Sequence, residues 1–282
     1  MSSRRAADHV SATGVVELTG AEVRFGTRTL WSELDLHVEP GEFITVLGGN
    51  GTGKTTLLKV LLGLLPLSAG TATIAGRPAT TGHSDVGYIP QQKSLDEALP
   101  LRGRDLVGLG VDGHRWGLGF LHRQSRRAIV DRLVDDVGAT AFADRPLGRL
   151  SGGEQQRLRV AAALAGDPKV LLCDEPLLSL DLPSQQLVAG LINRRRKVAN
   201  TAVVFVTHEI NPVLPYTDRV LYLANGRFRL GTPDEVINSK TLSDLYQTHV
   251  DVLKVRGRYI VIGADEETYE TGHHHHHHEE PA

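Results

Sequence analysis

Gly48-Gly49-Asn50-Gly51-Thr52-Gly53-Lys54-Thr55 is the stretch that decides the fold, because it fits the pattern G-x-x-x-x-G-K-[ST]. Glycines let a backbone curl until successive N–H groups point at one anion. The apolar run Glu42–Leu47 before it predicts a buried strand, and the residues from Lys54 onward predict a helix whose N-terminus adds positive charge. We therefore expect a phosphate-binding loop that ends at Thr56, with Lys54 at the β- and γ-phosphates and the Thr55 hydroxyl on Mg²⁺. The alternative, an incidental glycine-rich turn, does not explain why a strand precedes the loop and a helix follows it.

A second chemical feature is an apolar run that ends in two carboxylates, Val170-Leu171-Leu172-Cys173-Asp174-Glu175. In a parallel sheet both carboxylates would emerge at the carboxyl edge, beside the phosphate loop. Asp174 would then bind Mg²⁺ directly or through water, and Glu175 would orient or deprotonate an attacking water. Many strands end in acidic turns, so this interpretation depends on the phosphate loop.

A third feature is the pair Thr207-His208, which follows the apolar run Ala202–Val206. A buried parallel strand over that run would bring His208 to the same sheet edge. We expect His208 to contact the γ-phosphate. A surface or capping histidine is the alternative.

The remaining pattern indicates an α/β protein. Short alternating runs at Val15–Leu18, Ala21–Phe25 and Leu34–Val38 predict a half-exposed antiparallel subdomain. Helical periods begin at Gln91 and continue to about residue 166, with Ile129, Leu133, Val134 and Val137 at the spacing of one helix face. Asn225-Gly226 predicts a hairpin. The expected architecture is a core with a mostly parallel sheet, an antiparallel β subdomain and a helical insert.

Composition narrows the class of protein. The chain has 282 residues, of which 40% are apolar and 23% charged, as is ordinary for a soluble globular protein. A net charge of −2 gives no bulk attraction to nucleic acid, so no nucleic-acid partner is expected. The single cysteine, Cys173, excludes an internal disulfide and fits a reducing cytosol. The longest apolar stretch, Leu57–Leu67, is too short to cross a bilayer, which takes about 20 residues.

The family resemblance rests on Leu150-Ser151-Gly152-Gly153-Glu154-Gln155-Gln156-Arg157, which is similar to the ABC signature, usually written LSGGQ. The same residues also predict a helix start with a Ser151–Glu154 capping box, and both readings can hold together. With the three features above, the chain resembles the ATP-binding subunits of ABC transporters from about Val15 to Ile237. The resemblance implies the ABC ATPase fold around a P-loop NTPase core, with ATP and Mg²⁺ as ligands. It also implies a head-to-tail dimer in which Ser151, Gly152, Gly153 and Glu154 of one chain cover ATP held by the other.

The resemblance implies further roles in the site. Phe25 would stack on adenine, where a tyrosine is commoner; an exposed strand aromatic is the alternative. Gln91, after Tyr88-Ile89-Pro90, would touch the metal and join the core to the helical insert. Asp181 would communicate across the dimer, although Leu178 departs from the small polar residue often found in that loop.

The expected organisation has four parts. Residues 1–12 form an N-terminal tail, and residues 13–240 form the ABC ATPase domain with its helical insert at about 92–165. Residues 241–264 form a C-terminal appendage, and residues 265–282 an acidic, His-rich tail. His273–His278 is either a native metal-binding tract or a purification tag.

The cargo is inferred only from a looser resemblance, to the manganese/zinc branch of the importers. It rests on Asp96, Pro100 to Val107, Gly113 to Gly117, Tyr216 to Val220 and Val250 to Arg258. It implies an importer ATPase on the cytoplasmic face of the membrane, with a permease subunit and, indirectly, an extracytoplasmic metal-binding protein as partners. The alternatives are import of another solute such as chelated iron, or a soluble ABC ATPase without a permease. A regulator without turnover is disfavoured because Lys54, Glu175 and His208 are all present.

Overall fold

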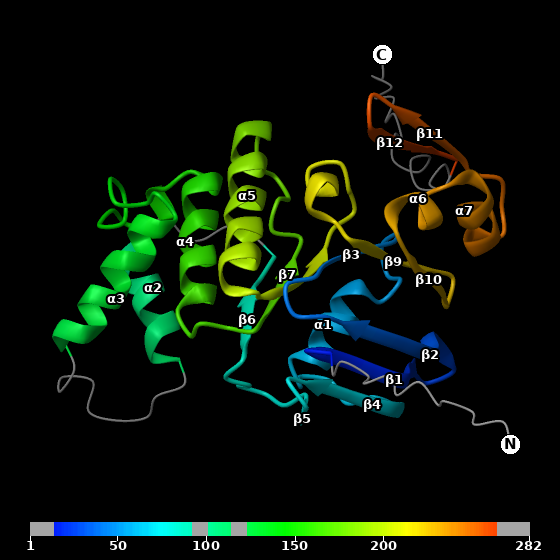
Figure 1. Ribbon diagram of the computed structural model, residues 1–282, viewed down its shortest axis with the longest axis horizontal. Coiled ribbons are helices and arrows are strands. Elements are labelled where there is room, and N and C mark those ends of the chain that lie inside the picture. Colours follow the sequence, from blue (N-terminus) through cyan, green and yellow to red (C-terminus); the bar gives the residue numbers. More distant parts are fainter. Residues whose placement is uncertain (1–13, 92–100, 114–122, 264–282) are drawn as a thin grey trace, which may run out of the picture.

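The computed structural model describes residues 14–91, 101–113 and 123–263, which form an α/β core with helices at one end (Figure 1). The central sheet has six strands in the order β10-β9-β3-β8-β7-β6. All neighbours in it are parallel except β9 and β10. Every residue of β3, β7 and β8 is buried, as expected for apolar strands covered on both faces. The bounds are β3 Phe43–Leu47, β6 Val86–Ile89, β7 Val170–Asp174, β8 Ala202–Val206, β9 Arg219–Ala224 and β10 Arg227–Gly231.

A second, antiparallel sheet packs beside the first, with the strand order β2-β1-β4-β5 (Figure 1). The separate strands expected at Val15–Leu18 and Ala21–Phe25 are one strand, β1. Its pairing with β2 shifts register between Leu18 and Ala21, where Gly20 has a φ of 52°. An irregularity of this kind bends a strand without ending it, so the break in the sequence pattern marks a bulge. The bounds are β1 Val16–Phe25, β2 Arg28–Val38, β4 Ala69–Ile74 and β5 Arg77–Pro78.

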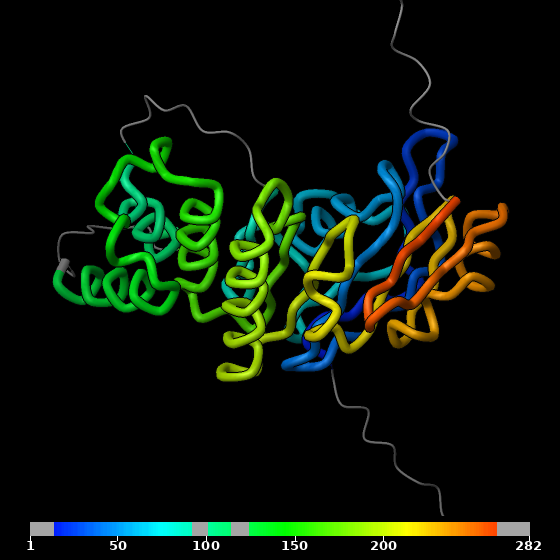
Figure 2. The backbone as a smooth tube through the Cα atoms, turned by 90° about the horizontal axis from the view of Figure 1, so that it is seen from above, coloured from blue at the N-terminus to red at the C-terminus, as the bar shows by residue number. Residues whose placement is uncertain are grey.

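Helices α2, α3 and α4 gather at one end of the molecule, with α5 beside them (Figures 1 and 2). The predicted apolar face of α3 and the turn after it is confirmed, since Leu133, Val134 and Val137 are buried and Ile129 packs against the same cluster. Among the described residues, no helix is long and apolar enough to span a membrane. The helices are α1 Lys54–Leu61, α2 Gly103–Asp112, α3 Arg123–Asp136, α4 Gly152–Leu164, α5 Leu182–Ala199 and α6 Pro233–Val236, with short 3₁₀ turns at Leu147–Arg149 and Leu214–Tyr216.

The C-terminal part lies at the opposite end from α2 and α3 (Figure 2). It consists of α7 Ser239–Tyr246 and the hairpin β11 Asp251–Val255 and β12 Arg258–Ile262. The predicted turn between β9 and β10 is confirmed: Asn225 and Gly226 have φ values of 49° and 75°, and Ala224 pairs with Arg227. Two positive φ angles are what a tight two-residue hairpin turn requires.

Candidate functional site

The loop between β3 and α1 has a backbone that only glycine accommodates at several positions. Gly48, Gly51 and Gly53 have φ values of 144°, 73° and 100°. A Cβ at Gly48 would lie 2.2 Å from the carbonyl oxygen of Leu223, in the neighbouring strand β9. The Thr52 hydroxyl donates to the Gly49 carbonyl over 3.0 Å and closes the turn. The loop therefore curls tightly against the sheet edge, as the sequence pattern predicts.

Lys54, the first residue of α1, is buried with its ammonium group inside this loop. Its Nζ donates to the carbonyl oxygens of Gly48 at 2.6 Å and Gly49 at 2.8 Å. Burial lowers the pKa of Lys54, although the negative charges of Glu175 and Asp174 oppose that shift. A phosphate oxygen that reached this ammonium would replace neutral carbonyl partners with a charged one, which makes a stronger hydrogen bond.

Asp174 ends β7 and faces α1. The Thr55 hydroxyl donates to its Oδ1 over 3.3 Å, and the Tyr88 hydroxyl donates to its Oδ2 over 3.5 Å. Burial, followed by the like charge of Glu175, raises the pKa of Asp174 against those hydrogen bonds. Burial also raises the pKa of Tyr88 to about 12, so its hydroxyl stays a donor. A carboxylate and a hydroxyl at this separation are hard oxygen ligands that fit Mg²⁺.

Glu175 and His208 meet at the same edge of the sheet. Glu175 has a positive φ of 45°, and its N–H donates to the carbonyl of Val206 at the end of β8. His208 Nδ1 lies 3.5 Å from Glu175 Oε2. Both side chains line a small cavity of about 60 Å³, together with Leu177, Leu178, Ser179, Gln185, Thr207, Glu209 and Pro212. That volume accommodates water beside a carboxylate and an imidazole.

The start of α4 has the predicted cap. The N–H of Glu154 donates to the Ser151 hydroxyl, and the N–H of Ser151 donates to the Glu154 carboxylate over 2.8 Å. A Cβ at Gly153 would lie 2.5 Å from the hydroxyl of Ser184 in α5. Asp181 in turn caps α5 by accepting from the Ser184 N–H at 2.9 Å. The N-terminal ends of α4 and α5 are therefore packed together through Ser184.

The two remaining predicted contacts lie on the surface. Phe25, the last residue of β1, exposes 52% of its area, and Gln91 is exposed just after β6. Neither side chain has a described partner at the phosphate loop. Residues Asp96, Pro100, Gly117, 114–116 and His273–His278 lie outside the described residues, as do the tails 1–12 and 265–282.

Three residues at the site were missed by the sequence interpretation. Arg28 Nη2 donates to the Gly51 carbonyl over 3.1 Å, Tyr88 holds Asp174, and the Thr207 hydroxyl bonds both the N–H and the C=O of Glu209. For Thr207 a signal existed, since it is the first polar residue after a fully apolar strand. For Arg28 and Tyr88 the contacts depend on how the two sheets pack.

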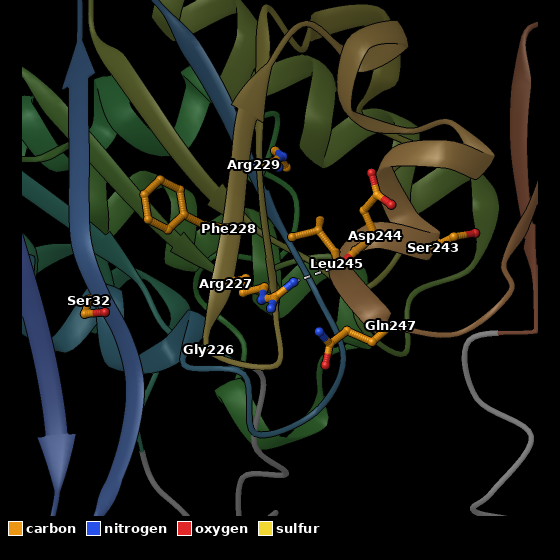
Figure 3. A pocket seen from close by; sticks show the side chains of 9 residues that line it. All are labelled: Ser32, Gly226, Arg227, Phe228, Arg229, Ser243, Asp244, Leu245 and Gln247. Carbon is orange, nitrogen blue, oxygen red and sulfur yellow. Dashed lines mark hydrogen bonds between the residues drawn. The ribbon is translucent and has the colours of Figure 1, made fainter.

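Another groove, of about 750 Å³, lies elsewhere, between β2, β10 and α7 (Figure 3). Arg227 reaches across it to the carbonyl of Asp244, as the dashed line marks. None of the predicted site residues lines it, so its size is no guide to the chemistry at the sheet edge. The lining residues are Ser32, Gly226, Arg227, Phe228, Arg229, Ser243, Asp244, Leu245 and Gln247.

Residues 31–178 match a family described as "ABC transporter". The chain belongs to the ABC transporter family. It is an ATP hydrolase that acts in transport, it binds adenine nucleotides, and it works as a dimer within a transporter complex.

Similar proteins include importer subunits with different cargoes. A zinc import ATP-binding protein of Halorhodospira halophila is 35% identical over 89% of this chain and 88% of its own. A sulfate/thiosulfate import ATP-binding protein of Bordetella pertussis is 34% identical over 86% of this chain and 69% of its own. A solved ATP-binding cassette dimer in a post-hydrolysis state, bound to ADP and phosphate, is 25% identical with a TM-score of 0.66. It covers 77% of this chain and 98% of its own.

Proposed function

We propose that this chain drives an importer for zinc or manganese by hydrolysing ATP at the site formed by Lys54, Thr55, Asp174, Glu175 and His208. The observation that carries the proposal is the Glu175–His208 contact of 3.5 Å at the edge where Asp174 also emerges. Three features far apart in the sequence thus lie together, and each carries one requirement of phosphoryl transfer. These are phosphate binding, metal binding and activation of water.

The phosphate loop and Lys54 bind the phosphates of ATP through backbone N–H groups and the buried ammonium. The residues that would contact the nucleotide here are Gly48, Gly49, Asn50, Gly51, Thr52, Gly53, Lys54, Thr55 and Thr56. Thr55 and Asp174 would hold Mg²⁺, with Gln91 as a further ligand. When bound, Mg²⁺ neutralises charge on the phosphate oxygens. Tyr88 keeps Asp174 oriented, since its hydroxyl donates to the carboxylate.

Glu175 is the general base in this proposal, and His208 contacts the γ-phosphate. A carboxylate that lines a water-sized cavity beside the phosphate loop is placed to accept a proton from an attacking water. His208 exposes about half of its side chain, so a ligand can reach its ring. The His208 ring lies 3.5 Å from the Glu175 carboxylate, and both side chains line the cavity.

The second copy of the chain completes each site. Ser151, Gly152, Gly153 and Glu154 would cover ATP held by the other copy, and the small size of Ser151, Gly152 and Gly153 would let the phosphate approach the helix start. Asp181 would carry the signal between subunits, because Ser184 joins its cap to the start of α4. Phe25 would stack on adenine from its exposed position.

The ATPase site is tested by Glu175→Gln, with Glu209→Gln as the matched control. Glu209 lines the same cavity, and the Thr207 hydroxyl bonds its backbone N–H and C=O groups, which the substitution leaves in place. We expect Glu175→Gln to bind ATP, to dimerise in its presence and to lose about 100-fold or more in turnover. Gel filtration with ATP and a phosphate-release assay measure both properties. Undiminished turnover in Glu175→Gln would remove Glu175 as the base.

The cargo rests on likeness to zinc import proteins and on the branch resemblance of the C-terminal segment. Sequence identity alone does not tell which cargo is carried. The zinc import relative is 35% identical to this chain, and the sulfate/thiosulfate import relative is 34% identical. The proposal includes a permease, an extracytoplasmic metal-binding protein and a place on the cytoplasmic face of the membrane. In this proposal, residues 13–240 form the ATPase domain, and its helical insert at about 92–165 contacts the permease.

Cellular metal content tests the cargo. We expect deletion of the gene to lower total zinc or manganese selectively under mild metal starvation. The wild-type chain should restore the level, and Lys54→Ala should not. Unchanged zinc, manganese and iron in cells without a redundant importer would refute the metal cargo and leave the ATPase assignment intact.

A further inference from the structure

The side chain of Asn211 joins the loop that carries His208 to the C-terminal hairpin. Its Nδ2 donates to the carbonyl oxygen of Tyr259 over 2.9 Å, and its Oδ1 accepts from the N–H of Tyr259 over 2.9 Å. The amide therefore satisfies both backbone groups of one strand residue, as a neighbouring strand would. Asn211 lies only three residues after His208, whereas Tyr259 lies 48 residues further along the chain.

The loop is fixed on both sides of His208. Before it, the N–H of Thr207 donates to the carbonyl of Val46 in β3, which ties the loop to the sheet. After it, Ile210 and Val213 are buried in the core, and the N–H of Val213 donates to the Ile210 carbonyl. The side chain of Asn211 adds hydrogen bonds to a distant part of the chain, beside the burial of Ile210 in the core and the 3.5 Å contact of His208 with Glu175.

The hairpin itself is held by contacts with α6 and α7. Tyr259 is buried, and its hydroxyl donates to Asp234 in the first turn of α6. The ammonium of Lys254 also pairs with Asp234 and lies 5.0 Å from the centre of the Tyr259 ring. The N–H of Val252 donates to the Ser239 hydroxyl at the start of α7. The hairpin is thus one packed unit with α6 and α7, and Asn211 holds the His208 loop against it.

We propose that Asn211 is a positioning residue for ATP hydrolysis, and that its contact with Tyr259 makes turnover depend on the C-terminal hairpin. The inference rests on the proposed role of His208. Without the amide, the loop after Thr207 keeps the buried side chains of Ile210 and Val213 but loses its hydrogen bonds to the hairpin, so the imidazole is held less precisely relative to Glu175 and to the γ-phosphate. A misplacement of about 1 Å, even from a change remote from the reacting atoms, can lower a rate by about 100-fold.

The test compares Asn211→Ala with a matched control, Ile260→Thr, in the full-length chain. Ile260 follows Tyr259 in β12 and exposes 47% of its area, so its replacement changes the hairpin surface and leaves the amide contact in place. We expect Asn211→Ala to lower kcat for ATP by roughly 10-fold to 100-fold, with KM for ATP changed by less than about 2-fold. Ile260→Thr should retain the wild-type kcat.

The double variant Asn211→Ala/His208→Ala separates positioning from a general structural effect. If Asn211 acts through His208, the double variant is no slower than His208→Ala alone. An additional fall equal to that of Asn211→Ala in the wild-type chain would overturn the proposal. A folded Asn211→Ala variant with the wild-type kcat would also overturn the proposal. Asn211→Asp, which keeps the shape but loses the donor to Tyr259, decides the point if Asn211→Ala does not fold.

His208→Ala by itself tells the two failures apart. If it retains wild-type turnover, the assignment of His208 is wrong whatever Asn211 does. If it loses turnover while Asn211→Ala and Asn211→Asp keep theirs, only the link to the hairpin is wrong.

Discussion

Replacing Gly48 by alanine should destabilise the protein in the absence of any nucleotide. Gly48 has a φ of 144°, which side-chain-bearing residues rarely adopt, and this strain costs about 1–3 kcal/mol. The new Cβ would also lie 2.2 Å from the Leu223 carbonyl and 2.8 Å from the Thr52 hydroxyl. Thr52 can rotate away, but Leu223 belongs to β9, which is paired with β3, so the strand cannot move freely. Overpacking of this kind costs about 1–3 kcal/mol more.

The sum is about 2–6 kcal/mol of lost stability. For a domain of this size, each kcal/mol lowers Tm by about 2–4 °C, so Gly48→Ala should melt at least about 4 °C below the wild type. The assay is thermal unfolding of nucleotide-free protein, followed by intrinsic fluorescence and circular dichroism, because bound ligand would itself raise Tm.

Gly49→Ala is the matched control, one residue along the same loop. A Cβ there would meet nothing nearer than the Thr52 methyl at 4.0 Å, and Gly49 has no positive φ. It should therefore melt within about 1–2 °C of the wild type. Equal melting temperatures for the two variants would refute the reasoning, because both carry the same chemical change.

Two further predictions concern the acidic edge and the loop after β8. Burial and the charge of Glu175 raise the pKa of Asp174, so its proton is held more tightly in the folded than in the unfolded protein. The free energy of unfolding then falls as the pH rises above the ordinary aspartate pKa of about 3.9. In the absence of Mg²⁺ and nucleotide, Asp174→Asn should therefore be more stable than the wild type at neutral pH. Urea unfolding should show that advantage shrinking towards pH 4; a constant advantage would contradict the assignment. Thr207→Val should lose about 1–2 kcal/mol, because the buried hydroxyl serves both backbone groups of Glu209, whereas Thr207→Ser keeps it. A Thr207→Val variant as stable as the wild type would show that the hydroxyl does not contribute.

The parts of the fold that follow from neighbouring residues could be predicted. The phosphate loop, the capping box at Ser151 and Glu154, and the Asn225-Gly226 turn depend on backbone conformations and hydrogen bonds within a few residues. The buried strands β7 and β8 follow from unbroken apolar runs. The division of β1 was wrong, because Gly20 interrupts the alternation of side chains without interrupting the strand.

The same distinction between local and long-range contacts applies to the candidate site. The sequence by itself determined which groups could bind phosphate and metal, because the motifs around Lys54, Asp174 and His208 act over short stretches of chain. Only the tertiary structure decided that Tyr88 holds Asp174, that Leu223 excludes a side chain at Gly48, and that Asn211 reaches Tyr259. These contacts join residues far apart in the sequence. Their distances are set by how sheets and helices pack, and no local pattern of residues records that packing.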